Sequence, residues 1–402
     1  MTSTAPVYDP RTPGFVADPY PHYAQLRAEN PVHRTRFGFV LLTRHSDLRA
    51  AYDSPTLSRN TRLWDGFSGW RRGSEDGPLE RMMQSWLVMI DPPRHTPLRA
   101  IHEAAFSRDR IAAMQADVEK IVGDLLDDAT AAGGMDAVAD FADRIPVYVI
   151  NHMLGIPRQD WDRFVGWSRA IAQTSEAFLT RAVLAEGKQA LQAMHDYFQP
   201  LVQDRRRYPG QDVLTALATE ESDGVRLTED LLLDSLIFLY QAGHPTGGQL
   251  LALALHSLLR HPDQLQLLRA DRSLLPGAVE ELQRFDGPVQ MNDRVAVTDQ
   301  EFAGLELRAG ELVRLCIAAA NRDPQRYPDP DTLDLGRDAD GQLGYGRGLH
   351  YCIGEQLGRL QTRVAIDALL ERAPGLRLAD GEEVTFLPSV SNRGLARMAV
   401  RF

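Results

Sequence analysis

The sequence predicts a mainly α-helical protein with a small β region, folded as one large body. Residues 107–206 and 228–261 carry apolar residues at helical spacing. After residue 286 the chain alternates short apolar runs with turns, which favours strands. A length of 402 residues ordinarily predicts two or three domains, but no Gly/Ser-rich or Pro-rich linker and no internal repeat divides this chain. We therefore expect a single domain.

The first elements expected are a strand at Phe37–Leu42 and a helix from about Ser46 to Asp53. Residues 60–90 are expected to form an irregular loop. Exposed aromatic side chains on a long loop often mark a ligand site, although the same side chains can simply anchor the loop to the core. The large side chains of this segment are Trp64, Phe67, Trp70, Met82, Met83 and Trp86.

A long buried helix is expected after residue 227. Thr228 is a good capping residue, and Glu229 and Asp230 place acids in the first turn. The pattern runs to Arg260, which makes a rod of roughly 50 Å. It is apolar on most faces, as in buried helices. The earlier helical segment, in contrast, is interrupted at residues 133–134 and 155–157 by Gly and Pro.

Composition excludes several classes of function. The net charge of −11 argues against nucleic acid or an anionic membrane as a partner. No window reaches the roughly 20 apolar residues needed to cross a bilayer, and no leader is visible, so we expect a soluble, cytoplasmic protein. The two cysteines, Cys316 and Cys352, give no disulfide framework, and Cys316 lies in an apolar run typical of a core residue.

Cys352 stands in the segment Tyr345-Gly-Arg-Gly-Leu-His-Tyr-Cys-Ile-Gly354. Gly346 and Gly348 permit backbone conformations that a β-carbon would obstruct. An apolar run with helical spacing begins after Gly354 and ends near residue 373. Cys352 is therefore expected near a helix N-terminus, where the macrodipole and free N–H groups favour a thiolate.

This segment resembles the haem-binding signature of the cytochromes P-450, Phe-Gly-x-Gly-x-His-x-Cys-x-Gly, with Tyr345 in place of Phe. Five matched positions at fixed spacing argue against a structural cysteine beside a Gly-rich turn. The resemblance covers essentially the whole chain and implies a single cytochrome P-450 domain over residues 1–402, of the soluble bacterial type. Its β-rich parts would lie near 30–60, 288–320 and 376–402, its helical body at 95–285 and 353–373, and its long central helix would cross a buried haem.

Further motifs match the family residue by residue. Glu281 and Arg284 share a helix face and resemble its Glu-x-x-Arg pair, with Arg337 at the position of the arginine that completes the network. This network is expected to brace the loop that carries Cys352. The resemblance also implies that haem propionates are bound by residues at four matching positions, since buried carboxylates need fixed cations and donors. These residues are His95, Arg99, Arg294 and His350, with Tyr345 and Gly346 alongside the haem.

The central helix departs from the family. Its segment Ala242-Gly243-His244-Pro245-Thr246 matches the pattern Ala-Gly-x-Asp/Glu-Thr, except that Pro245 replaces the acid. In the family the acid and the threonine deliver protons for oxygen activation. Proline lacks a backbone N–H and glycine weakens a helix, so we expect a kink or groove here. Protons would come from water held by Thr246 and the Gln241 carbonyl, from His244, or from the substrate.

The resemblance implies a haem-thiolate monooxygenase that inserts one atom of O2 into a small organic substrate. Cys352 would be the axial ligand of the iron, haem b (iron protoporphyrin IX) the cofactor and O2 the co-substrate. Specialised natural-product metabolism is expected, on a free or carrier-protein-tethered substrate, with electrons from a ferredoxin-type donor and its reductase and with the enzyme as a monomer. Two alternatives stay open: oxidative coupling or use of peroxide, motivated by Pro245, and a non-catalytic haem-binding or sensing protein.

Overall fold

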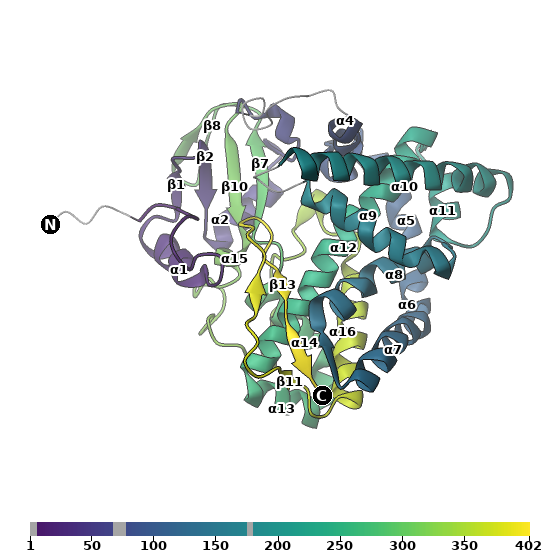
Figure 1. Cartoon of the computed structure of the whole chain (residues 1–402). Helices are drawn as coiled ribbons and strands as arrows, with labels where there is room; N and C mark the ends of the chain where they lie inside the picture. The colour runs from purple at the N-terminus through teal and green to yellow at the C-terminus, as the bar shows by residue number, and fades with distance from the viewer. Residues whose placement is uncertain (1–5, 67–77, 175–179) are drawn as a thin grey trace. The chain divides into compact units, whose positions relative to one another are not determined.

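The computed structural model describes residues 6–66, 78–174 and 180–402, and it confirms the mainly α-helical fold with smaller β regions (Figure 1). The chain divides into two compact units. One comprises Met1–Gly73, Ala252–Cys352 and Glu383–Met398, and the other comprises Ser74–Leu251, Ile353–Glu382 and Ala399–Phe402. The expectation of a single domain stays a prediction.

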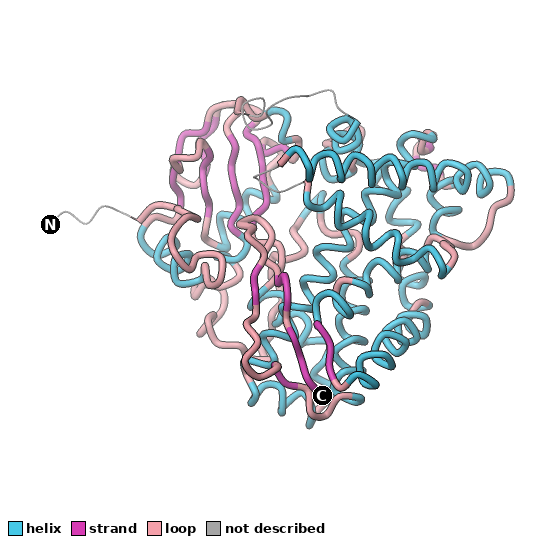
Figure 2. The backbone as a smooth tube through the Cα atoms, viewed as in Figure 1, coloured by secondary structure: helices cyan, strands magenta, loops and turns pink. Residues whose placement is uncertain are grey.

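The first unit is built on a five-stranded sheet, whose strands stand side by side in Figure 2. The strand order is β1 (Val32–Arg34), β2 (Phe39–Leu42), β10 (Leu312–Cys316), β7 (Met291–Ala296) and β3 (Leu57–Ser58). Only β2 and β10 run parallel, and Val40 lies opposite Val313. Successive side chains of β2 enter different core clusters, Leu41 in one and Leu42 in the other, because side chains of a strand alternate between its two faces. The sheet is therefore buried on both sides.

Short helices and hairpins complete this unit. The predicted early strand and helix are confirmed as β2 and α2. The helices are α1 (Tyr20–Glu29), α2 (His45–Asp53), α13 (Pro262–Ala270), α14 (Leu275–Asp286) and α15 (Ile317–Ala320), with 3-10 turns η1 (Thr61–Leu63), η5 (Arg272–Leu274) and η6 (Gly348–His350). The hairpins are β8 (Gln300–Phe302) with β9 (Leu305–Leu307), and β12 (Thr385–Phe386) with β13 (Leu395–Arg397).

The second unit is mainly helical. Its helices are α4 (Pro78–Ser85), α5 (His95–Ala105), α6 (Arg108–Ala113), α7 (Gln115–Ala132), α8 (Arg144–Met153), α9 (Trp161–Gln173), α10 (Arg181–Arg207), α11 (Val213–Thr219) and α16 (Glu355–Arg372), with shorter turns η2 (Leu87–Met89), η3 (Ala137–Ala142) and η4 (Arg158–Asp160). Helices α9 and α10 pack along each other (Figure 1). Its strands are β4 (Gly134–Asp136), β11 (Arg377–Leu378) and β14 (Ala399–Arg401), which form one small sheet, and the hairpin β5 (Glu221–Ser222) with β6 (Val225–Arg226).

The long buried helix is confirmed as α12, Glu229–Arg260. Its first turn is capped as predicted, because the Leu231 N–H donates to Thr228 Oγ1 at 3.3 Å. The helix continues across Pro245. In the part of the chain that the structure describes, no helix is long and apolar enough to cross a membrane.

The prediction of an irregular loop over the whole of residues 60–90 is wrong for its second half. Its second half contains α4 and η2, and Met82, Met83 and Trp86 are buried. The Trp86 ring stacks on Phe238 of α12 with centroids 5.1 Å apart, so it anchors this segment to the core. The run Met82-Met83-Gln84-Ser85-Trp86 has helical spacing, which the polar stretch before it obscured. Phe67 and Trp70 lie outside the described residues.

Candidate active site

The segment carrying Cys352 is a tight loop that requires two of its glycines. The Gly346 N–H donates to Leu343 O and the Cys352 N–H donates to Tyr345 O, both at 2.9 Å. Gly346 and Gly348 have φ angles of +71° and +70°, the left-handed region that side chains disfavour. A β-carbon on Gly348 would also lie 3.2 Å from the Tyr52 carbonyl oxygen. The loop therefore fixes the backbone at Cys352.

The two cysteines have opposite environments. Cys316 is fully buried in β10, and burial raises the pKa of its thiol to about 12, which makes it inert. Cys352 is only half-buried and lies three residues before Glu355, the first residue of α16. Cys352 therefore lies close to a helix N-terminus, as predicted. Within the described ranges, no three His, Cys, Asp or Glu side chains gather as a metal site.

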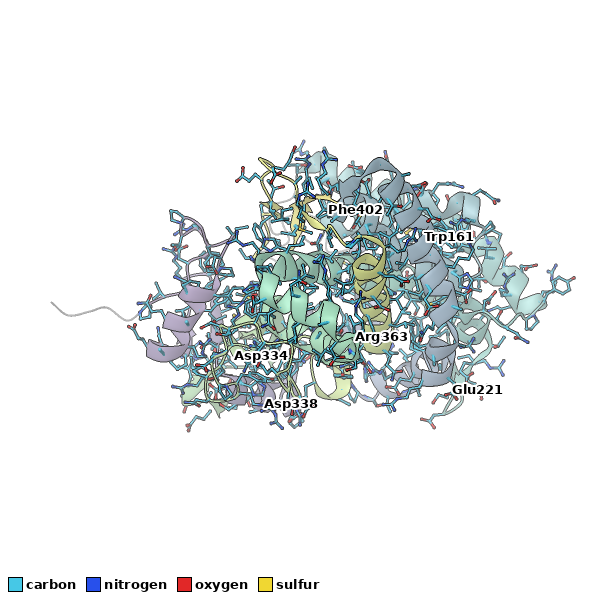
Figure 3. The ribbon with its side chains drawn as sticks, turned by 90° about the horizontal axis from the view of Figure 1, so that it is seen from below. Trp161, Glu221, Asp334, Asp338, Arg363 and Phe402 are labelled. Carbon is cyan, nitrogen blue, oxygen red and sulfur yellow. The ribbon has the colours of Figure 1, made fainter. Side chains whose placement is uncertain are left out.

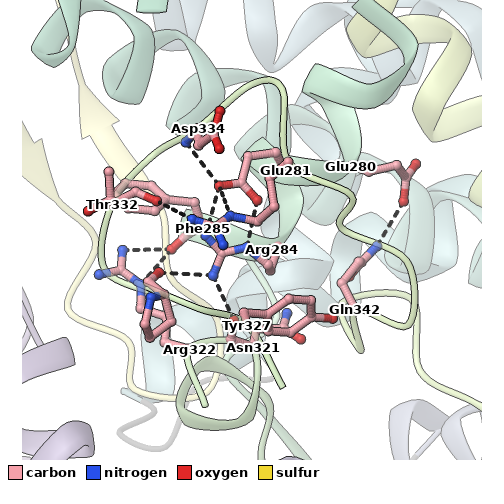
Figure 4. A network of polar contacts seen from close by, with 12 residues as sticks. Glu280, Glu281, Arg284, Phe285, Asn321, Arg322, Tyr327, Thr332, Asp334 and Gln342 are labelled. Atoms are coloured by element: carbon pink, nitrogen blue, oxygen red, sulfur yellow. Dashed lines mark hydrogen bonds and ion pairs between the residues drawn. The ribbon is translucent and has the colours of Figure 1, made fainter. Parts of the chain in front are cut away.

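Glu281 lies at the centre of a buried polar network (Figure 4). Both Glu281 and Arg284 are shielded from solvent, with Nε–Oε2 at 2.6 Å and Nη2–Oε1 at 2.8 Å. Arg337 adds an ion pair to Oε1 at 3.2 Å, and the Asp334 N–H donates to the same oxygen at 3.1 Å. Charge-assisted bonds of this kind are what a buried carboxylate requires. The structure therefore brings the three predicted residues together.

A chain of hydrogen bonds joins this network to the cysteine loop. Arg284 Nη1 donates to the Asn321 carbonyl at 2.8 Å, and Asn321 Oδ1 accepts from the Leu343 N–H at 2.8 Å. The Leu343 carbonyl in turn accepts a hydrogen bond from the Gly346 N–H. Sequence reasoning missed the part played by Asn321. Its signal was its place in the Asn-Arg-Asp-Pro turn that directly follows α15.

Of the four residues matched to propionate contacts, Arg294 and His350 belong to the first unit. Arg294 is 3% exposed, and its guanidinium lies 4.9 Å from the centre of the Tyr52 ring. The Tyr52 hydroxyl also accepts from Asn292 at 3.0 Å. Because Tyr52 borders both Arg294 and the Gly346–Gly348 backbone, it is a site residue that sequence reasoning missed. His350 is half-buried and ends η6.

His95 and Arg99 belong to the second unit and lie one turn apart on α5, as their spacing predicted. His95 is 1% exposed at the first position of the helix. Arg99 Nε pairs with Glu103 at 2.7 Å and its side chain is 16% exposed. His95 is therefore enclosed at the N-terminus of α5, and Arg99 lies one turn further on beside a carboxylate.

Glycines let α12 approach α8 and the residues just before it. A β-carbon on Gly248 would lie 3.0 Å from the Ala142 carbonyl oxygen and 3.3 Å from Asp143 Cα. One on Gly247 would lie 3.2 Å from Pro146, and one on Gly243 would lie 3.1 Å from Ile150. Close helix packing, which sequence reasoning had not considered, therefore accounts for these glycines.

His244 is held by both of its ring nitrogens. Nδ1 lies 2.8 Å from Ser168 Oγ of α9, and Nε2 lies 2.7 Å from Asp143 Oδ1. Asp143 also pairs with Arg169. Although burial disfavours the Asp143 carboxylate, the hydrogen bond from His244 and the Arg169 charge lower its pKa to about 2.

Thr246 Oγ1 donates to the Ala242 carbonyl at 2.6 Å, and both residues lie on another face of α12 from His244.

Three arginines near Cys352 in sequence all have partners. Arg347 Nε contacts Asp53 at 3.0 Å, Arg359 pairs with Glu355, and Arg363, which Figure 3 labels on α16, donates to Gln115 at 3.1 Å. Exposed pairs of this kind contribute little to stability. Asp53 and Glu355 offset the charges of Arg347 and Arg359, whereas the neutral amide of Gln115 leaves the charge of Arg363 in place.

Known proteins share the fold and much of the sequence. Residues 171–373 match the sequence profile of the family described as Cytochrome P450. The chain is 37% identical to the cytochrome P450 monooxygenase PikC of Streptomyces venezuelae, over 100% of this chain and 95% of that protein.

Two solved structures show the same architecture. CalO2 matches with a TM-score of 0.91 at 33% identity, covering 99% of each chain. P450BioI in complex with an acyl carrier protein ligated to hexadec-9Z-enoic acid matches with a TM-score of 0.89 at 32% identity, covering 97% of this chain and 100% of that chain. The chain therefore belongs to the cytochrome P450 family and is a monooxygenase, an oxidoreductase that uses haem iron and O2.

Proposed function

We propose that this monooxygenase holds haem b through Cys352 and oxidises a small organic substrate of specialised metabolism. The observation that carries the proposal is the loop of Cys352, in which two left-handed glycines present an accessible cysteine beside the N-terminus of α16. When bound, the haem would supply activation of O2, and a thiolate ligand favours O–O cleavage. The described residues fit such a group, since Cys352 is accessible where Cys316 is not.

The propionates would be held by His95, Arg99, Arg294 and His350. Burial of Arg294 at 3% exposure supports this role, because a buried guanidinium is suited to a carboxylate partner. Its stacking on Tyr52 fixes its orientation. The Glu281–Arg284–Arg337 network would keep the cysteine loop rigid through Asn321.

Proton delivery would rely on water held by Thr246 rather than on His244. Both ring nitrogens of His244 are engaged by Ser168 and Asp143. The Thr246 hydroxyl lies on the other face of the helix, and Pro245 has no N–H with which to bond the Gln241 carbonyl. Gly243 and His244 would thus act by packing and positioning.

The substrate would be either free or tethered to a carrier protein. The relative crystallised with an acylated carrier protein supports the tethered form for an enzyme of this architecture. We expect the protein to act in the cytoplasm as a monomer, with electrons from a ferredoxin-type donor and its reductase. A net charge of −11 supports the expectation that neither nucleic acid nor an anionic membrane is a partner.

The axial ligand is tested by the absorption spectrum of the reduced protein with carbon monoxide. The wild type is expected to show the red-shifted Soret band of a thiolate complex, and Cys352→Ser is expected to lose it. Cys316→Ser is the matched control and keeps the band, because Cys316 is a core residue. A normal band in Cys352→Ser would overturn the proposal.

The form of the substrate is tested by spectral titration of the ferric protein. Free aromatic and amino acids are compared with the same groups on carrier proteins. A low-to-high-spin shift only with tethered groups would identify a carrier-dependent enzyme. A shift with the free compounds would identify an ordinary small-molecule oxygenase.

Pro245 favours one alternative, an enzyme that couples phenols or uses peroxide and needs less control over protons. In that case Pro245→Glu does not raise oxygenation coupled to the reductant. A clear rise in coupled oxygenation would contradict the alternative and support an oxygenase that compensates for its missing acid.

A further inference from the structure

One face of α12 is half-buried or exposed between Leu231 and Gln249, whereas most of the other residues in this stretch are buried. Ala242 is exposed, and the other residues of this face are half-buried: Leu231, Asp234, Phe238, Gln241, Pro245, Thr246 and Gln249. Their spacing of three and four residues places them on one stripe. This stripe contains Thr246, so under the proposed function it is the side of α12 that faces the reaction.

Asp234 is the half-buried carboxylate of this stripe, and Asp230, one turn earlier on the same face, is exposed. Ser85 Oγ of α4 lies 2.5 Å from its Oδ2 and 2.6 Å from the Met82 carbonyl oxygen. A hydroxyl has one proton, so Ser85 cannot satisfy both acceptors fully. Among the described residues no lysine or arginine pairs with Asp234. The protein thus supplies this carboxylate with one shared hydroxyl donor, and its remaining acceptor capacity is left to solvent or to a ligand.

The surroundings of Asp234 favour a cation. Burial raises the pKa of Asp234, the hydrogen bond from Ser85 opposes this shift, Asp230 adds to it, and His195 of α10 lowers it. One helical turn after Asp234, the ring of Phe238 stacks on the ring of Trp86, so aromatic side chains lie next to the carboxylate along the helix. Carboxylates and aromatic rings both attract an ammonium group that has been partly removed from water.

We propose that Asp234 is a specificity residue that binds an ammonium group on an elongated substrate. This inference rests on the proposed function and names the substrate class. Eight residues separate Asp234 from Ala242 and twelve separate it from Thr246, which correspond to about 12 and 18 Å along the helix axis. The substrate therefore carries its positive charge at the end remote from the oxidised carbon.

The test uses the haem-loaded ferric protein and three probes of equal length: dodecyltrimethylammonium, dodecanol and dodecanoate, each below its micelle-forming concentration. A quaternary ammonium cannot ligate iron, so its binding is read from the spin shift and independently by calorimetry. The wild type is expected to prefer the ammonium probe. Asp234→Asn can still accept a hydrogen bond from Ser85. It is expected to weaken binding of the ammonium probe about tenfold and to leave binding of dodecanol unchanged. Asp128→Asn, an exposed carboxylate on α7, is the control and keeps the preference.

Ser85→Ala separates specificity from a merely structural role. If Asp234 only ties α4 to α12, Ser85→Ala and Asp234→Asn weaken all three probes alike, and the proposal is overturned. If Asp234 binds the ammonium, Ser85→Ala frees the carboxylate and keeps or raises affinity for that probe alone. Absence of an ammonium preference in the wild type also overturns it. The thiolate band with carbon monoxide, measured on the same samples, reports separately on the proposed function.

Discussion

Glu281 shows how a common sequence pattern acquires a role only through its partners. A Glu-x-x-Arg spacing on an exposed helix face contributes a few tenths of a kcal/mol. Here the side chains of Glu281 and Arg284 are fully buried. The Glu281 carboxylate accepts hydrogen bonds from Arg284, Arg337 and the Asp334 N–H. Losing one member of a buried pair leaves an uncompensated charge, so the pair matters most when it is broken.

We expect Glu281→Gln to lower the free energy of unfolding by about 3 kcal/mol, because Arg284 and Arg337 would lose their shared anion. Urea unfolding of the purified protein measures this. The neighbouring Glu280→Gln is the control and should change it by less than about 1 kcal/mol, since Glu280 is only half-buried and accepts a hydrogen bond from the neutral amide of Gln342 at 3.2 Å. Equal effects of the two variants would contradict the central role of Glu281.

The lowered pKa of Asp143 predicts how the stability of the folded protein depends on pH. Its pKa is about 2 in the folded protein against an ordinary value of 3.8, so its stabilisation is present above pH 4 and is lost as the pH falls toward 2. Asp143→Asn is expected to reduce stability by about 2 kcal/mol at pH 6, and the difference should shrink steadily below pH 4. Urea unfolding from pH 6 to pH 3 measures it.

The control for Asp143 is Asp196→Asn on the exposed face of α10, which should alter stability by less than about 0.5 kcal/mol. A difference between wild type and Asp143→Asn that stays constant from pH 6 to pH 3 would show that Asp143 acts through packing instead of charge.

At the scale of elements, sequence patterns located the regular segments and missed what joins them. The capped start of α12 and the turn before α16 were readable, because caps and glycines act locally. The helix α4 was missed because a polar stretch precedes its short apolar run. The closeness of α12 to Ala142–Asp143 was also invisible, since it joins residues about a hundred positions apart. The glycines of α12, which with Pro245 predict a kink or groove, also serve this close packing.

Gly248 and Gly277 test this packing as a matched pair. Gly248→Ala is expected to destabilise the protein by about 1–2 kcal/mol, because its β-carbon would press on the backbone of Ala142 and Asp143. Gly277→Ala in α14 has nothing within 4 Å and should stabilise by about 0.5–1 kcal/mol through helix propensity. Thermal unfolding compares them. Stabilisation by both substitutions would show that α12 can move away from its neighbour.

At the scale of the whole molecule, the candidate haem ligands come from segments far apart in the sequence. Cys352 follows a loop fixed by Asn321, and Arg294 lies on β7 against Tyr52 of α2. The motif around Cys352 was readable alone because its glycines and cysteine are adjacent. Tyr52 and Asn321 could not be predicted, because only the folded chain brings them to the loop. Haem binding should therefore depend on the integrity of the fold as well as on Cys352.

We expect haem to stabilise the folded protein by about 4 kcal/mol when it is present at a thousandfold excess over its dissociation constant, because it binds the folded chain alone.

Arg294→Ala is expected to weaken haem retention by about 2 kcal/mol through loss of a buried cation for a propionate. The rate of haem loss to an excess of a haem-scavenging protein measures this. Arg308→Ala, an exposed arginine of the same unit, is the control and should not change that rate. If Arg294→Ala destabilised the haem-free protein as much as the loaded one, with no faster loss of haem, Arg294 would serve the sheet and Tyr52 instead of the cofactor.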